Sequence, residues 1–170
     1  IKEPVVEVAS AASIKNKSVS VQFPDEEKYT GIGARLPIAN FQLKYIGKDT
    51  GIEIKCTTEN KKPYYVIATN STTICKLKGT QLCIPLTLVD GWNKVEIDLE
   101  YLLGSIGQRF VSVESVTVYS SCRLRKIFFS DTKYNDWELP YKLRVLPILE
   151  TQFKKLSSES TGESPTKIRS

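Results

Sequence analysis

Residues Val89 to Pro140, VDGWNKVEIDLEYLLGSIGQRFVSVESVTVYSSCRLRKIFFSDTKYNDWELP, carry the pattern that decides the fold. The stretch opens with Asp90-Gly91, a dipeptide typical of tight turns because glycine adopts a positive φ without steric cost. Apolar and polar residues then alternate from Asn93 to Leu99, which is the period of a half-buried strand. A second β-rich segment runs from Val111 to Phe129. The two predicted strands flank Glu100 to Gly107, for which we expect a single helical turn.

The alternation changes phase in the second of these strands. Cys122 and Leu124 have one parity, whereas Ile127 and Phe129 have the other, which they share with the arginines at positions 123 and 125. Either a β-bulge or a strand that is covered on both faces explains this change. The arginines are then expected at a rim and not in the bulk core.

Beyond this strand, the sequence predicts one more helical turn. Asn135 or Asp136 is a suitable cap for it, and Pro140 ends it because proline disfavours helical geometry in the residue before it. The carboxylates Asp131, Asp136 and Glu138 could form a catalytic pair, but we expect them to cap this turn and to pair at its rim.

Elsewhere the chain also reads as β structure. Strands are predicted around Pro4 to Val8, Ser18 to Phe23, Phe41 to Ile46, Gly51 to Cys56, Tyr64 to Ala68 and Leu82 to Leu88. Turn residues between Gly47 and Gly51 predict that the flanking strands form a hairpin. Pro85 predicts an edge strand, because proline cannot donate to a ladder. Asn70 to Lys78 reads as polar and irregular. About nine strands with almost no helix predict an all-β, antiparallel β-sandwich.

Length and composition fit one domain. The chain has 170 residues, of which 41% are hydrophobic and 25% charged. We expect a β-sandwich domain over residues 1–150 and a polar, Ser- and Lys-rich tail over residues 151–170 that would be disordered on its own. No apolar run is long enough to cross a bilayer and no signal peptide is visible, so no membrane association is predicted. The absence of methionine, even at position 1, predicts an internal piece of a longer product.

The inventory of reactive residues argues against catalysis. The chain has no histidine, so the usual general base is missing, and no catalytic residue is proposed. Cys56, Cys75, Cys83 and Cys122 lack the spacing of a zinc site, and neither a metal site nor a cofactor is predicted. Because most of them sit in apolar stretches, we expect free thiols.

Two further readings stay open at this point. The triplets that begin at Asn16 and Asn70 satisfy the N-x-S/T rule for glycan acceptors, which is the best case for a secreted protein. The aromatic residues Trp92, Tyr119, Trp137 and Tyr141 could line a face that stacks on sugars.

Three separate sequence motifs in this chain resemble those of one known family. They are the DGWN run from Asp90, the SCRLRKIFFSD run from Ser121 and the ELP run from Glu138. Their order and spacing are similar to those of the cilia- and flagella-associated protein twenty family, also called Bug twenty-two. Weaker similarity around Gly31 to Pro37 extends the likeness to most of residues 5–148. The chain departs from the family in its opening segment and in its tail, so it resembles a diverged paralogue or a fragment.

The resemblance implies a jelly-roll β-sandwich that acts as a non-catalytic structural protein of the ciliary axoneme. Family members sit at the inner junction of doublet microtubules, beside α/β-tubulin and the parkin co-regulated protein, and stabilise the doublet for motility. Alternatives are a carbohydrate-binding-module-like recognition domain, or an adaptor at the centriole, the basal body or the nucleus. The family has no catalytic residues to carry over.

The charge of the chain also agrees with a microtubule partner. The formal net charge is +5, and cations gather in short clusters that favour an acidic partner surface, as microtubules offer. Nucleic acid is the competing acidic partner, but basic residues interleaved with aromatics on one face are not evident in the sequence. The candidate partner-binding residues are Arg123, Arg125, Lys126, Lys133, Lys142 and Arg144.

Overall fold

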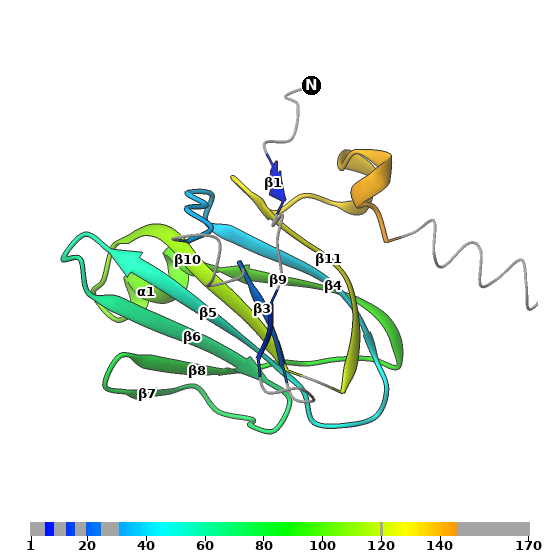
Figure 1. Cartoon of the computed structure of the whole chain (residues 1–170), viewed down its shortest axis with the longest axis horizontal. Coiled ribbons are helices and arrows are strands. Elements are labelled where there is room, and N and C mark those ends of the chain that lie inside the picture. The colour runs from blue at the N-terminus through cyan, green and yellow to red at the C-terminus, as the bar shows by residue number, and fades with distance from the viewer. Residues whose placement is uncertain (1–5, 9–12, 16–19, 25–30, 120, 146–170) are drawn as a thin grey trace, which may run out of the picture.

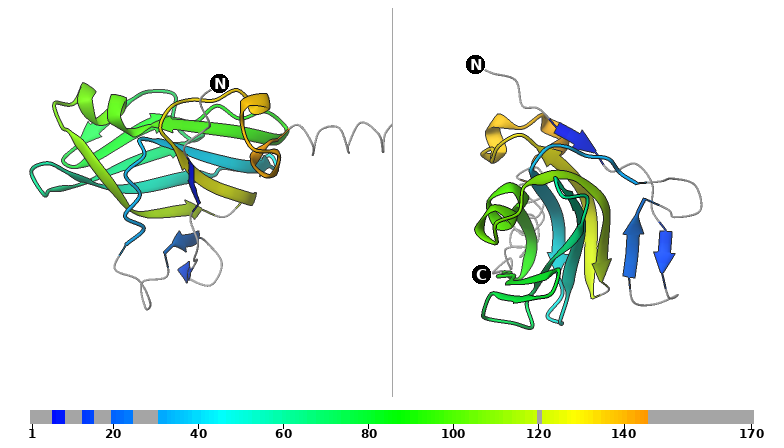
Figure 2. Two further views of the ribbon diagram at one scale, coloured as in Figure 1. Left: turned by 90° about the horizontal axis from the view of Figure 1, so that it is seen from above. Right: turned by 90° about the vertical axis from the view of Figure 1, so that its left-hand side faces the viewer.

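The protein is a sandwich of two β-sheets, as the sequence predicts. A computed structural model describes residues 6–8, 13–15, 20–24, 31–119 and 121–145. One sheet has four strands in the order β1-β11-β4-β9, and the other has seven in the order β2-β3-β10-β5-β6-β8-β7. Figure 1 shows the two layers, and Figure 2 shows them from two further sides. The sequence-based expectation of an all-β sandwich with short helical turns is confirmed.

The strands of the four-stranded sheet are β1 (Val6–Val8), β4 (Ile38–Tyr45), β9 (Gly91–Asp98) and β11 (Cys122–Ser130). Those of the seven-stranded sheet are β2 (Ser13–Lys15), β3 (Ser20–Phe23), β5 (Gly51–Thr58), β6 (Pro63–Thr69), β7 (Lys76–Lys78), β8 (Gln81–Pro85) and β10 (Phe110–Tyr119). Among these described strands, all pairings are antiparallel except that of β6 with β8. The inward residues of both sheets, including Phe41, Ile54, Val66 and Phe129, form the main buried cluster.

A β-bulge explains the change of phase in β11. Leu124 pairs with Leu43 and Lys126 pairs with Gln42, so Arg125 is an extra residue without a partner in β4. The bulge lets Leu124 pack against the core on one side of it and Ile127 on the other, although the two are three positions apart. The same strand is also covered on both faces, because Phe128 belongs to a second buried cluster. Both explanations offered by the sequence therefore apply.

Two helical segments lie where the sequence predicts them, and a third, over Tyr141–Leu143, follows Pro140 and was not predicted. Helix α1 (Leu99–Ser105) begins after Asp98, whose carboxylate accepts a hydrogen bond of 2.9 Å from the backbone N–H of Tyr101. At seven residues it is longer than the single turn expected. The single-turn helices η1 (Asp136–Glu138) and η2 (Tyr141–Leu143) follow β11. Asn135 precedes η1 as its N-cap residue, and Pro140 lies between the two turns.

Two predictions about the arrangement of strands are wrong. β4 and β5 do not form a hairpin, because β4 pairs with β9 and β11 in one sheet while β5 pairs with β6 and β10 in the other. The turn residues between them reverse the chain across the sandwich and not within one sheet. β8 is not an edge strand, because it lies between β6 and β7. Pro85 is tolerated because it is the last residue of β8, beyond the three residues that pair with β7.

The predicted strand from Val111 to Phe129 is two strands, β10 and β11, which lie in different sheets. The sequence also missed two short strands. β2 falls in the connection between the first two predicted strands, and β7 falls in the segment that read as irregular. Each has three residues, too few for an alternating pattern to stand out. The tail over residues 151–170 and the acceptor triplet at Asn16 lie outside the described residues. In the part of the chain that the structure describes, no helix has the length and apolar character that a membrane span requires.

The cysteines differ sharply in their environments. All four thiols are free; Cys56 is buried in the core, whereas Cys75 is exposed. Burial, together with the nearby Glu114 carboxylate, raises the pKa of the Cys56 thiol to about 12. Because thiol reagents attack the thiolate, we expect Cys75 to react in the native protein at neutral pH and Cys56 to react only after denaturation. Peptide mapping after timed alkylation measures this, and Cys75→Ser is the control. Rapid native labelling of Cys56 would contradict the buried placement.

Candidate functional site

The outer face of the four-stranded sheet and the segment that follows β11 carry the basic residues singled out from the sequence, three on each. Residues 131–145, which we call the clamp, follow β11 and contain both single-turn helices. The two turns lie outside the sandwich in Figures 1 and 2. Phe128 of β11 packs with Leu139 and Leu143 of the clamp, and partly buried Tyr134 packs against this cluster. The clamp therefore covers part of the outer face with a second, smaller hydrophobic core.

Long polar side chains of the sheet bind the backbone of the clamp. Arg125 donates from Nη1 to the Gln42 side-chain oxygen and to the Arg144 carbonyl, both at 3.1 Å. The Gln42 amide in turn donates to the Leu143 carbonyl. The ammonium groups of Lys126 and Lys94 donate to the carbonyls of Lys142 and Tyr134. These bonds satisfy clamp carbonyls that accept no hydrogen bond from a described backbone N–H.

Arg144 organises the clamp from within. Its Nε donates to the Leu139 carbonyl at 2.7 Å, and its Nη2 donates to the Trp137 carbonyl at 3.0 Å. The next residue, Val145, donates its backbone N–H to Asp136 Oδ1 at 2.7 Å. Arg144 and Val145 together thus connect η1 and the residue after it to the chain that follows η2.

The six candidate contact residues divide into two sets. Arg125, Lys126 and Arg144 donate hydrogen bonds within the fold, as described above. The other three are exposed, and within the described residues no hydrogen bond or ion pair involves their side chains; they are Arg123, Lys133 and Lys142. The first set holds the clamp in place, and the second set is available to a partner.

The sheet register adds two residues that the sequence reasoning did not place. Arg123 of β11 lies directly opposite Lys44 of β4, and Lys44 lies opposite Trp92 of β9. Residues directly opposite each other point to the same face of a sheet. Arg123, Lys44 and Trp92 thus form a row across the outer face. The alternating pattern of each strand already placed Lys44 and Trp92 on the side opposite to the apolar residues. The register that aligns them with Arg123 could not be seen in the sequence.

The four aromatic residues considered for sugar stacking do not form one face. Trp92 is on the outer face of the four-stranded sheet, because its neighbours Asn93 and Val95 point inward. Tyr119 is on the outer face of the seven-stranded sheet, where its hydroxyl donates to Glu53 at 3.2 Å. Trp137 and Tyr141 belong to the clamp and are 67% and 70% exposed. Trp92 and Tyr119 lie on opposite faces of the sandwich and cannot line a single site.

The three carboxylates that might have formed a catalytic pair are engaged in local structure. Asp131 accepts from the Tyr134 hydroxyl at 2.6 Å, and Glu138 accepts from the Asn135 backbone N–H at 2.7 Å. Asp136 accepts from Val145, as noted above. The sequence-based preference for capping and rim pairing is confirmed.

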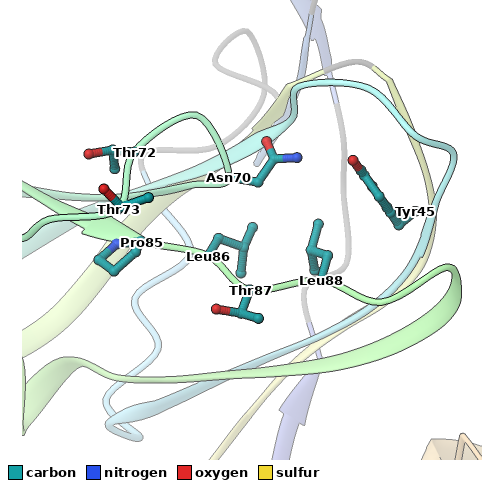
Figure 3. Close-up of a pocket in the computed structure, with 8 residues that line it drawn as sticks. All are labelled: Tyr45, Asn70, Thr72, Thr73, Pro85, Leu86, Thr87 and Leu88. Carbon is teal, nitrogen blue, oxygen red and sulfur yellow. The ribbon is translucent and has the colours of Figure 1, made fainter.

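A hollow of about 470 Å³ lies at the end of the sandwich where β4 finishes. Figure 3 shows residues 86–88 running between Pro85 and Tyr45, with Thr72 and Thr73 beyond Pro85. Asn70, at its rim, accepts from the Thr50 N–H at 2.8 Å and donates to the Lys48 carbonyl at 3.2 Å. The amide nitrogen that a glycan would occupy is therefore already a donor within the fold.

Comparison with known proteins agrees with the fold. The sequence matches the family model of the CFA20 domain over residues 1–147. It is 27% identical over 145 residues to Cilia- and flagella-associated protein 20 of Paramecium tetraurelia, covering 82% of this chain and 75% of that protein. The protein of the same name from Chlamydomonas reinhardtii is 26% identical over 145 residues, covering 82% of this chain and 76% of its own length. The Caenorhabditis elegans protein of that name is 24% identical over 119 residues, 69% of this chain and 59% of its own length. The chain belongs to the CFA20 domain family, whose curated members compared here are cilia- and flagella-associated proteins.

Proposed function

We propose that this chain is a non-catalytic structural protein of the ciliary axoneme. In this proposal it binds tubulin at the inner junction of doublet microtubules, beside the parkin co-regulated protein, and stabilises the closure of the B-tubule onto the A-tubule. Membership of the CFA20 domain family supports the ciliary setting. The observation that carries the proposal is the set of exposed cations on the outer face of the four-stranded sheet and on the clamp.

A rigid scaffold and uncommitted charge are what such a role requires. The bulge at Arg125 and the clamp hold the outer face in one shape, so binding loses little conformational freedom. Arg123 and Lys142 are exposed cations whose side chains make no hydrogen bond or ion pair with another described residue. Facing an acidic polymer, they attract it over roughly a Debye length, about 8–10 Å at physiological salt. Exposed Trp137 and Tyr141 add apolar contact area on the same segment.

The two sets of basic residues have different roles in this proposal. Arg125, Lys126 and Arg144 are positioning residues that keep the clamp on the sheet. Arg123, Lys133 and Lys142 are contact residues for tubulin or for a neighbouring inner-junction protein. Lys44 and Trp92 extend the contact surface along the row that starts at Arg123.

Co-sedimentation with polymerised microtubules tests the proposal. The triple variant R123E/K133E/K142E is expected to bind about tenfold more weakly or worse, because three positive charges on the contact surface become negative. The matched control is K48E/K76E/K78E, which inverts the same charge at exposed positions on loops and the far edge of the other sheet. The control should bind nearly as the parent chain does.

Two results would overturn the proposal. One is an equal loss of binding in both triple variants, which would mean that net charge alone governs the interaction. The other is equal binding to duplex or single-stranded DNA at matched salt, which would favour a nucleic-acid partner. Localisation of the tagged protein in cells distinguishes the axoneme from the centriole and the nucleus.

A further inference from the structure

Among the residues that the structure describes, the strand β9 forms an unusually long free edge. The two sheets end in β1, β9, β2 and β7, and β9 has eight residues where each of the other three has three. Short edge strands are one of the common devices by which proteins prevent unwanted pairing. A long edge therefore indicates either protection by another element or a use in pairing.

The alternation of hydrogen-bonded and non-hydrogen-bonded residues along the β4–β9 ladder shows which backbone groups of β9 are free. The Leu99 N–H donates to the Pro37 carbonyl at 2.9 Å, in the same register as the β4–β9 ladder. In an antiparallel pair every second residue exchanges hydrogen bonds with its partner, so the odd-numbered residues of β9 bond to β4. The N–H and C=O groups of Trp92, Lys94 and Glu96 thus point away from the sheet. Within the described residues, no hydrogen bond reaches these outward groups.

We propose that β9 pairs antiparallel with β9 of a second copy of this chain, about a twofold axis through Val95. The free even-numbered residues of each copy then face free residues of the other, which is the phase that an antiparallel ladder needs. The four-stranded sheets of the two copies become one continuous sheet.

Charge selects this register over its neighbours. With Val95 opposite Val95, Lys94 lies opposite Glu96 of the partner subunit, and the same pairing recurs on the other side of the axis. An axis at Lys94 or at Glu96 would instead put like charges directly opposite, which destabilises a pair. An axis at Ile97 would place Glu96 of one copy directly opposite Asp98 of the other, which are again like charges. An axis at Asn93 would leave fewer residues of β9 paired. The sequence of β9 is therefore self-complementary about one residue.

The side chains of β9 are already arranged for this pairing. Lys94 and Glu96 form an ion pair at 3.0 Å and keep 19% and 25% of their side chains exposed, so both charges are held at the outer face. On the inner face Asn93 would lie opposite Ile97 of the partner subunit. The Asn93 amide donates to the carbonyls of Val89 and Gly91 at 2.8 and 2.9 Å, so it presents no unpaired donor to that apolar neighbour.

The pairing has one further consequence, which rests on the proposed function. A twofold axis perpendicular to the sheet puts both outer faces on the same side, so the dimer would present two contact surfaces to one filament and gain from bivalency. Edge pairing alone buries less area than a standard interface, so we expect a monomer–dimer equilibrium that depends on concentration.

Complementary charge variants of the 170-residue chain test the register. Lys94→Glu alone and Glu96→Lys alone each place like charges opposite one another, and each is expected to shift the equilibrium toward monomer by about tenfold. An equimolar mixture restores both opposite-charge pairs in the heterodimer. Sedimentation velocity or native mass spectrometry should therefore show heterodimers at a level near that of the parent chain.

The control mixture combines Lys94→Glu with Glu100→Lys, which carries the same charge change at an exposed position outside β9. In this mixture the Glu100→Lys chain should form homodimers as the parent chain does, but heterodimers should stay scarce, because one of the two cross-strand pairs still opposes like charges. A parent chain that stays monomeric at its highest soluble concentration, or rescue by both mixtures alike, would overturn the proposal.

A second variant does not depend on the charges. At the twofold axis the two Val95 residues form a non-hydrogen-bonded pair with Cα atoms about 4.5 Å apart, a spacing at which disulfides form. Val95→Cys should give a disulfide-linked dimer under mild oxidation, identified by peptide mapping, whereas Ile97→Cys should not link to itself. The reverse pattern would exclude the axis at Val95. Neither experiment involves microtubules, so failure here leaves the proposed function standing.

Discussion

Phe128→Ala is expected to lower the free energy of unfolding by about 3–5 kcal/mol, the usual loss when a buried phenylalanine is truncated. Phe128 is fully buried, and it is the only large apolar side chain that β11 contributes to the smaller cluster under the clamp among the described residues. Its removal leaves Leu139 and Leu143 facing a cavity. Chemical denaturation measures the loss, and hydrogen exchange locates it.

The location of the effect distinguishes the two cores. In Phe128→Ala, amides of residues 139–145 should lose protection first, while those of β5 and β6 stay protected. Phe129→Ala is the control, because Phe129 is equally buried but belongs to the main core. That variant should lower protection across both sheets. Unchanged protection of the clamp in Phe128→Ala would show that the clamp is held mainly by hydrogen bonds.

Arg125→Glu is expected to destabilise the fold by about 1–3 kcal/mol, whereas Arg123→Glu should stay within about 0.5 kcal/mol of the parent chain. Both arginines are exposed and lie two positions apart on β11, and both changes invert the same charge. Only Arg125 donates within the fold, to Gln42 and to the Arg144 carbonyl. Its replacement by glutamate removes both bonds and puts a carboxylate near a carbonyl oxygen.

Microtubule binding should distinguish Arg123 from Arg125 in the way opposite to stability. Arg123→Glu is expected to weaken microtubule binding while its thermal midpoint stays unchanged, which is the mark of a contact residue. For Arg125, the conservative Arg125→Gln keeps a donor without the charge and should recover part of the lost stability. Equal midpoints for the two glutamate variants would show that the bulge does not tie the clamp to the sheet.

Much of the fold was visible in the sequence because it depends on local patterns. Alternation in β5 and β9 gives the inward face of each strand, since a side chain's direction changes at every residue. The parity change around Arg125 indicated either a bulge or a strand covered on both faces, without knowledge of any strand partner. Asn135 and Pro140 marked one helical turn, because caps and proline act on their immediate neighbours.

Strand partners and the roles of single cations were decided only by the tertiary structure. The turn between β4 and β5 has the same local chemistry whether the chain returns within one sheet or crosses to the other, so the predicted hairpin was wrong. Six basic residues looked alike in the sequence, yet Arg125, Lys126 and Arg144 meet carbonyls and the other three meet solvent. Hydrogen bonds between residues far apart in the chain depend on register and packing, which no local pattern contains. The sequence by itself determined which residues face inward and where strands bend; the packed sheets determined which strands pair, which charges are already engaged, and which edge is left free.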